Sequence, residues 1–276
     1  MYILISAYIL AAASLSSWAK RNDWGRQSFI QSPQRLNHCP ALMPIFLFGV
    51  WIVSMLVFAK FISIITGIED TDNLIISQSS LGAASAITIL IAIIAASILF
   101  DDGIIGFGID IRTIKTDSLR AVKVLAKTYP AILSLMLTVG YLAPIISNGE
   151  MQMPSHPLLD YANNSGSIYV IIFVAFIAVV LAPAIEEILF RGYVQTKLSD
   201  NLQSRLYAIL LTSIIFAVIH GGELWLHWPA LFLFSCALGY VYEKSGSLLQ
   251  AIFMHAIFNA VNLSLSLIYA KYFVEL

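Results

Sequence analysis

One apolar stretch of this chain reads Pro183-Ala-Ile-Glu-Glu-Ile-Leu-Phe-Arg-Gly192 and carries three charged side chains. It continues the run 167–185, which contains no charged residue. Burying a carboxylate in lipid is costly unless the group is paired or put to use. The stretch therefore predicts that Glu186 and Glu187 do chemistry inside a membrane.

The composition supports a membrane location. Of 276 residues, 59% are hydrophobic and 11% are charged, and the mean hydropathy is +0.85, whereas a soluble domain carries about 25% charged residues. A net charge of −1 argues against a nucleic-acid partner, which needs a basic surface. Cys39 and Cys236 are too few for a zinc–thiolate site.

Apolar windows of about 20 residues predict an all-α, polytopic membrane protein of about eight transmembrane helices. The run at the N-terminus is interpreted as an uncleaved span rather than a signal peptide, because its basic residues follow it. We expect the active-site cavity within the last four spans. The predicted spans are 2–19, 42–66, 80–100, 128–147, 167–198, 205–221, 229–243 and 247–269.

Loop charges predict the orientation. Loops 20–41 and 101–127 are rich in lysine and arginine, whereas 67–79 and 148–166 carry acidic residues and no lysine or arginine. The positive-inside rule places the basic loops in the cytoplasm. Residues 117–127 have an amphipathic helical pattern, which fits a helix lying on anionic lipid or a solvated helix that enters the next span.

Polar residues of two later spans reach the depth of the glutamates. At about 1.5 Å per residue, Glu186 lies about 18 Å from the cytoplasmic surface, His220 about 22 Å, His255 about 12 Å and Asn259 about 18 Å. Scattered polar residues need not agree in depth. This agreement predicts that the three helices share one site.

The spacing within each helix suits catalysis. Glu187 and Arg191 are four residues apart, so they lie on one face and can form an ion pair. Glu186 is rotated by about 100° from Glu187, which leaves its carboxylate available for a catalytic water. His255 and Asn259 are also four residues apart and can both donate to an oxygen that gains negative charge.

These residues form three motifs in chain order: Glu186-Glu187-xxx-Arg191, Phe216-xxx-His220 and His255-xxx-Asn259. The set resembles the CPBP (Abi) family of intramembrane proteases, which includes type II CAAX prenyl endopeptidases and bacteriocin-processing enzymes. The resemblance covers roughly residues 167–263, and no motif position departs from the family pattern. It divides the chain into an N-terminal transmembrane region with basic cytoplasmic loops, 1–166, and a CPBP-like catalytic helical core, 167–276.

The resemblance implies a glutamate-type intramembrane endopeptidase of the cell membrane that opens to the cytoplasm. Its expected substrate is a membrane-bound or lipid-modified peptide, including a prenylated CAAX protein, and its expected partners are that substrate and membrane lipid. It also implies a role for each motif residue. Glu186 would activate water, with His220 holding it; His255 and Asn259 would stabilise the oxyanion; Glu187 and Arg191 would brace the site.

Three alternatives remain from the sequence. The family has also been described as metallopeptidases, so zinc held by His220, His255 and a glutamate stands beside the metal-free reading. We favour no metal, because an asparagine four residues from His255 suits an oxyanion donor. A non-catalytic scaffold or immunity protein of the same fold is the second alternative. A proton-coupled transporter is the third, although no internal repeat supports it.

Overall fold

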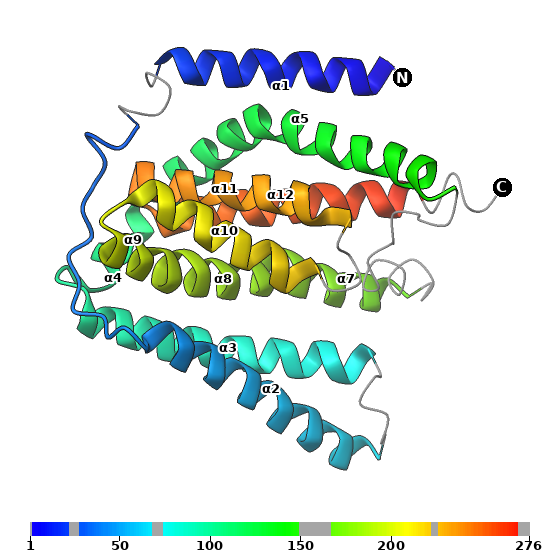
Figure 1. The fold of residues 1–276 in the computed structure, drawn as a ribbon. Helices are drawn as coiled ribbons and strands as arrows, with labels where there is room; N and C mark the ends of the chain where they lie inside the picture. The colour runs from blue at the N-terminus through cyan, green and yellow to red at the C-terminus, as the bar shows by residue number, and fades with distance from the viewer. Residues whose placement is uncertain (1, 22–27, 68–73, 149–166, 222–225, 270–276) are drawn as a thin grey trace. The chain divides into compact units, whose positions relative to one another are not determined.

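The computed structural model describes residues 2–21, 28–67, 74–148, 167–221 and 226–269. Within these residues it contains no β-strand, only one isolated bridge between Asn37 and Phe100. The all-α prediction is therefore confirmed. The helices in Figure 1 are α1 (Tyr2–Arg21), α2 (Met43–Thr66), α3 (Leu74–Leu99), α4 (Gly103–Gly106), the 3₁₀ turn η2 (Ile111–Thr113), α5 (Ile114–Ile146), α7 (Ile168–Phe176), the π-helix η3 (Ile177–Leu181), α8 (Ala182–Glu187), the π-helix η4 (Ile188–Gln195), α9 (Thr196–Leu202), α10 (Arg205–Gly221), α11 (Trp228–Ser245) and α12 (Leu248–Tyr269).

The apolar helices make this an integral, multi-pass membrane protein. Among the described residues, five segments are long and apolar enough to span a bilayer: Met43–Thr66, Ile76–Leu99, Ile111–Ile146, Ile168–Leu202 and Leu248–Ile268. A shorter apolar helix covers Arg205–His220. Each range predicted as a span coincides with helix, but the number of helices that cross the bilayer stays a prediction.

Helix α5 joins the amphipathic stretch 117–127 to the span that follows it. It runs without interruption from Ile114 to Ile146 and contains Pro130 and Pro144. The basic face of residues 117–127 therefore belongs to the same helix as an apolar stretch that is long enough to cross a membrane. This arrangement fits a helix that enters the next span.

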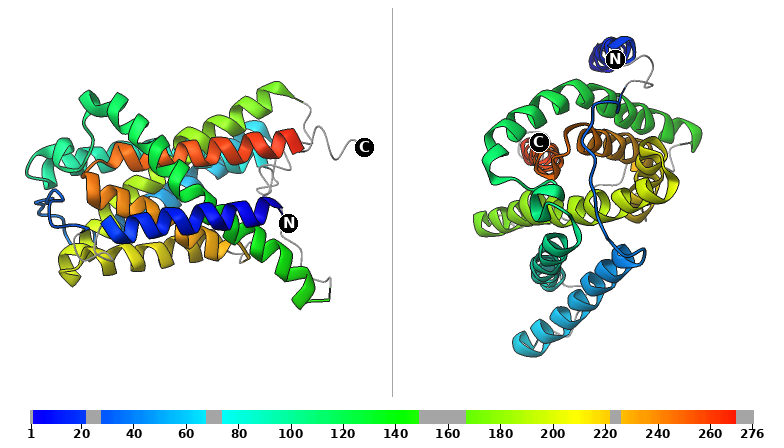
Figure 2. Two further views of the ribbon diagram at one scale, coloured as in Figure 1. Left: turned by 90° about the horizontal axis from the view of Figure 1, so that it is seen from above. Right: turned by 90° about the vertical axis from the view of Figure 1, so that its left-hand side faces the viewer.

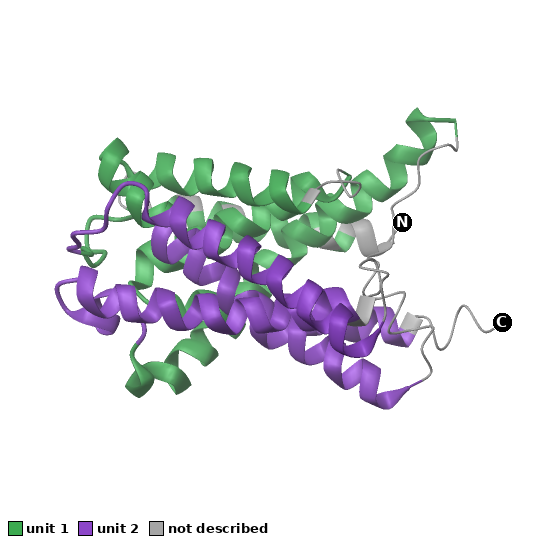
Figure 3. Cartoon of the chain, turned by 90° about the horizontal axis from the view of Figure 1, so that it is seen from below, with its two compact units in different colours: residues 1–35, 110–154, 194–254 green, residues 36–109, 155–193, 255–276 purple. Residues whose placement is uncertain are grey.

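The chain forms two compact units that alternate along the sequence (Figure 3). Unit 1 comprises residues 1–35, 110–154 and 194–254, and unit 2 comprises 36–109, 155–193 and 255–276. Each unit draws on both halves of the chain. The division into 1–166 and 167–276 rests on the resemblance and stays a prediction.

Unit 2 is built on the paired helices α2 and α3, which pack along each other (Figure 1). Trp51 Nε1 of α2 donates a hydrogen bond of 3.1 Å to Ser85 Oγ of α3. Helix α3 also contacts α8, and the Tyr193 hydroxyl donates to the carbonyl of Ala92. These contacts hold the helix that carries the glutamates against α3.

Gly192 lies against the buried ring of Phe107. A Cβ at position 192 would lie 2.6 Å from Cε2 of that ring, which is closer than a real Cβ contact. We expect Gly192→Ala to lower the free energy of unfolding by about 1–3 kcal/mol, since the packed ring must move. Thermal unfolding in detergent measures this. Gly49→Ala is the matched control: Gly49 lies in α2 with open space around its Cα, so an unchanged or higher Tm is expected there. Equal Tm values for both variants would contradict the packing argument.

In unit 1, α1 packs along α5, and α10 packs against α11 (Figures 1 and 2). A buried charge cluster in this unit surrounds Glu243. The fully buried carboxylate of Glu243 forms an ion pair with Arg35 and lies 3.6 Å from Nε of Arg205. Gln195 Nε2 donates to Glu243 Oε1 at 2.9 Å. The guanidinium of Arg35 also lies 3.9 Å from the ring centroid of Tyr242, a cation–π contact.

Candidate active site

The glutamates lie on a helical segment that contains two π-helical stretches. The π-helix η3 precedes α8, and the π-helix η4 follows it. The amide of Ala182 donates to the carbonyl of Ile177, five residues back. The next amide in this register is that of Pro183, which has no N–H, so the carbonyl of Ala178 lacks that donor. Such π segments occur frequently at functional sites.

Asn259 of α12 supplies the missing donor. Its Nδ2 donates a hydrogen bond of 2.8 Å to the carbonyl of Ala178. A carbonyl left unbonded among apolar helices is costly, so this contact stabilises the irregular backbone near the glutamates. Asn259 therefore fixes α12 against the segment 177–181, a contact that its spacing from His255 did not predict.

Glu187 is fully buried and both of its oxygens face a partner. Oε2 lies 3.1 Å from Nε of Arg191, whose side chain is also fully buried. This confirms the predicted pair. Oε1 lies 2.8 Å from Nδ1 of His255, which comes from α12. An ionised carboxylate only accepts hydrogen bonds, so Nδ1 carries the hydrogen in this contact.

Glu186 is the more accessible of the two glutamates. Its side chain is 15% exposed, against 0% for Glu187. Oε2 of Glu186 lies 3.8 Å from Nε2 of His255, the nitrogen that faces away from Glu187. This distance is too long for a direct hydrogen bond, but a single oxygen atom can contact both groups. A water molecule to one side of the pair can thus bond to both Glu186 and His255.

His220 belongs to unit 1, whereas the residues above belong to unit 2. Its Nδ1 lies 2.8 Å from the carbonyl of Phe216 in the same helix, and its ring stacks on the Phe216 ring at a centroid distance of 4.1 Å. These contacts orient the imidazole within α10. Its participation in the site stays a prediction.

The zinc alternative requires residues from both units. Within the described residues, no group of three or more histidine, cysteine, aspartate or glutamate side chains is placed to hold a metal ion. In unit 2, Glu187 is engaged by Arg191 and His255, which leaves Glu186 and Nε2 of His255 as candidate ligands. A His₂Glu set needs a third ligand, and His220 was the residue predicted for it. The absence of a metal therefore stays the prediction of the sequence, with zinc as its alternative.

Comparison with known proteins agrees with the motifs. Residues 168–261 match the family model described as type II CAAX prenyl endopeptidase Rce1-like. This segment therefore resembles that family. The resemblance to the CPBP family is thus confirmed for the part of the chain that carries the glutamates and both histidines.

A curated relative is the UPF0177 protein YxdF of Lactococcus lactis subsp. lactis (strain IL1403). It is 30% identical over 84 residues, which are 30% of this chain and 45% of the relative. The matched part therefore spans less than half of the relative's length. No solved structure matches the chain at a significant level.

The Rce1-like segment also contains buried polar residues that sequence reasoning missed. Gln195 and Glu243 are fully buried and bond to each other, and Arg205 lies beside them. All three belong to unit 1. A signal was present: Glu243 is an acidic residue near the end of an apolar span, and Arg205 opens another. The sequence positions of Glu243 and Arg205 do not show which side chains they contact.

Proposed function

We propose that this protein is an intramembrane endopeptidase that hydrolyses a peptide bond with a water activated by Glu186. One observation carries the proposal: within an Rce1-like segment, Glu186 and Nε2 of His255 face each other across 3.8 Å. The fully buried Glu187–Arg191 pair lies behind them and orients the imidazole. A charged, polar site in apolar helices is expensive and is typically functional.

Glu186 acts as the general base. The water oxygen attacks the carbonyl carbon of the scissile bond while one water proton passes to the Glu186 carboxylate. Collapse of the tetrahedral intermediate breaks the C–N bond, and the same proton passes to the leaving amine. Glu187 is unsuited to this role because Arg191 and His255 occupy its two oxygens.

His255 and Asn259 stabilise the oxyanion. Because Nδ1 of His255 donates to Glu187, its Nε2 can donate only from a doubly protonated ring. Two glutamates, Arg191 and an imidazolium sum to zero net charge, which suits a site of low dielectric. Asn259 uses one amide hydrogen for the carbonyl of Ala178, and its second hydrogen is the proposed oxyanion donor.

The substrate class follows from the location of the site. Glu186 and Glu187 lie within a 35-residue apolar segment, Ile168–Leu202, so a substrate must reach them through the membrane or from its surface. We propose a membrane-bound or lipid-modified peptide, including a prenylated CAAX protein, cut near the cytoplasmic leaflet. The family match supports this class. A lipid chain would remain in the bilayer while the peptide enters the site.

Cleavage of a matched peptide pair tests the proposal. Purified protein in detergent is offered a fluorogenic prenylated CAAX peptide and its unprenylated twin, with and without a strong chelator. We expect cleavage of the prenylated peptide that persists with the chelator. Loss of cleavage on chelation, restored by zinc, would overturn the metal-free mechanism. Cleavage of neither peptide, nor of bacterial peptide precursors, would favour the non-catalytic scaffold.

A further inference from the structure

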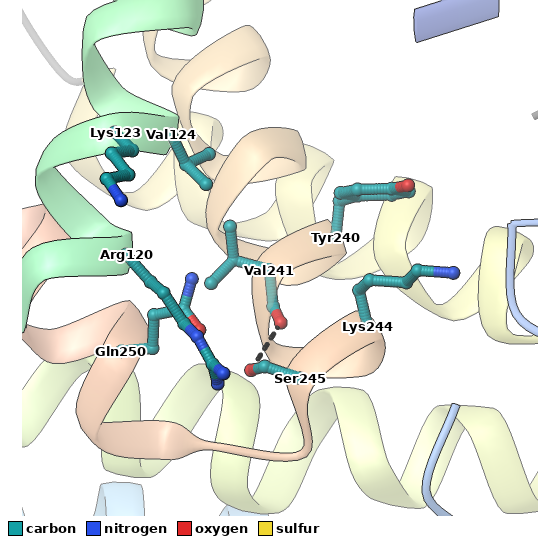
Figure 4. Close-up of a pocket in the computed structure, with 8 residues that line it drawn as sticks. All are labelled: Arg120, Lys123, Val124, Tyr240, Val241, Lys244, Ser245 and Gln250. Carbon is teal, nitrogen blue, oxygen red and sulfur yellow. Dashed lines mark hydrogen bonds between the residues drawn. The ribbon is translucent and has the colours of Figure 1, made fainter. Parts of the chain in front are cut away.

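Unit 1 contains a second polar feature, separate in sequence and in chemistry from the motif residues. A pocket of about 340 Å³ opens where α5, the end of α11 and the start of α12 meet (Figure 4). It is lined by Arg120, Lys123, Val124, Tyr240, Val241, Lys244, Ser245 and Gln250. The mechanism proposed above uses none of these residues.

The pocket is basic. Arg120 and Lys123 are three residues apart on α5 and therefore share one helix face. Figure 4 shows the Arg120 side chain reaching from α5 towards Ser245 and Gln250. The pocket lining contains no acidic residue, and within the described part of the chain neither cation forms an ion pair. Lys244 contributes its aliphatic stem, because its ammonium donates to the carbonyl of Ser28. Such a pocket is suited to an anion.

Neighbouring aromatic residues indicate that the pocket lies at the membrane interface. The ring of Tyr240 lies 5.8 Å from that of Trp18 and 5.5 Å from that of Phe29, measured between centroids. Tryptophan and tyrosine concentrate at the level of lipid headgroups. Helix α1 ends just after Trp18 with Lys20 and Arg21, as expected where an apolar helix leaves the bilayer. At such an interface the pocket would lie at the level of the headgroup phosphates.

Gln250 provides a separate indication of a ligand. The residue is 5% exposed, and its Oε1 has no hydrogen-bond partner among the described residues. A buried acceptor without a donor is costly, and the wall around it includes the apolar Val124 and Val241. A ligand hydroxyl would satisfy it. The requirement is thus for an anion that also carries a hydroxyl group.

We propose that this pocket binds the headgroup of an anionic glycerophospholipid that bears a free hydroxyl, such as phosphatidylglycerol. Arg120 and Lys123 bind the phosphate, and Gln250 accepts a hydrogen bond from the headgroup hydroxyl. The lipid chains lie along the apolar surface of unit 1. The proposal is independent of the peptidase activity, and its test requires no substrate.

Lipid titration of delipidated, full-length protein in detergent, followed by native mass spectrometry, tests this site. We expect phosphatidylglycerol to bind at least about tenfold more tightly than phosphatidylcholine. Each cation near the headgroup strengthens lipid binding about fivefold. The double variant Arg120→Gln with Lys123→Gln should therefore weaken phosphatidylglycerol binding about 30-fold. Gln250→Leu should reduce the preference for phosphatidylglycerol over phosphatidate about fivefold, because phosphatidate lacks the headgroup hydroxyl.

The matched control is Lys115→Gln with Lys127→Gln. Both lysines are exposed on α5 and neither lines the pocket, so binding should stay within twofold. Equal loss in the two double variants would overturn the site and indicate general charge attraction. Displacement of the lipid by free glycerol 3-phosphate at the same concentration would show that the pocket binds a soluble phosphate, and would overturn the proposal of a lipid ligand. Unchanged Tm values exclude unfolding as the cause.

Discussion

Glu186→Gln is expected to lower the rate of peptide cleavage by about 10²–10⁴-fold, the range of a general base. Glutamine keeps the shape of the side chain and cannot accept the proton from water. Glu186 is partly exposed, and its Oε2 lies 3.8 Å from Nε2 of His255. The substitution therefore removes a reacting group and leaves the buried Glu187–Arg191 pair in place. The measurement is kcat for the lipidated peptide.

Two controls distinguish loss of chemistry from loss of structure. The Tm of Glu186→Gln in detergent should stay close to that of the wild type, because Glu186 is partly exposed and the fully buried Glu187–Arg191 pair stays intact. Gly49→Ala lies in open space on α2 and keeps both glutamates, so its kcat should equal that of the wild type. Turnover by Glu186→Gln within tenfold of the wild type would refute the role assigned to this residue.

Arg191→Met is expected to lower the free energy of unfolding by about 3–5 kcal/mol, the cost of leaving a buried charge without its partner. Arg191 and Glu187 are fully buried, with Nε and Oε2 3.1 Å apart. Methionine retains the apolar stem and removes the guanidinium. Glu187 then keeps only the hydrogen bond of 2.8 Å from Nδ1 of His255. Denaturant unfolding in mixed micelles measures the change.

The double variant Glu187→Gln with Arg191→Met tests whether the unpaired charge of Glu187 causes the loss of stability. Both charges are then absent, and a glutamine oxygen still accepts from His255. We expect the double variant to be more stable than Arg191→Met, because replacing a buried pair by neutral groups is often nearly neutral. The interaction energy between Glu187 and Arg191 in this double-mutant cycle should exceed about 1 kcal/mol. Additive losses would contradict the ion pair and indicate that each side chain acts through packing alone.

Local sequence relations predicted part of the fold and of the site. Residues 43–66 and 248–269 form helices because apolar runs of this length satisfy their backbone hydrogen bonds internally in lipid. The pairing of Glu187 with Arg191 was also predictable, because the spacing of four residues places both side chains on one helix face. These are properties of one helix, and the sequence contains all the information they need.

Contacts between distant parts of the chain required the tertiary structure. Helical periodicity shows which residues share a face, but not which helix that face meets. His255 bonds to Glu187 across 68 positions, and Asn259 bonds to Ala178 across 81. The second contact also depends on a π register, which Pro183 alone does not specify.

The amino-acid sequence by itself determined the helices, the membrane location and the motif residues, because each depends on hydrophobicity and on spacing within one segment. Tertiary structure decided that Glu187 orients His255, that Asn259 completes the backbone of η3, and that Glu243 is buried beside Arg35 and Arg205. These outcomes depend on how helices rotate and pack. A buried polar group is stable only where another segment supplies its partner, and the partner's identity is a property of the packed chain.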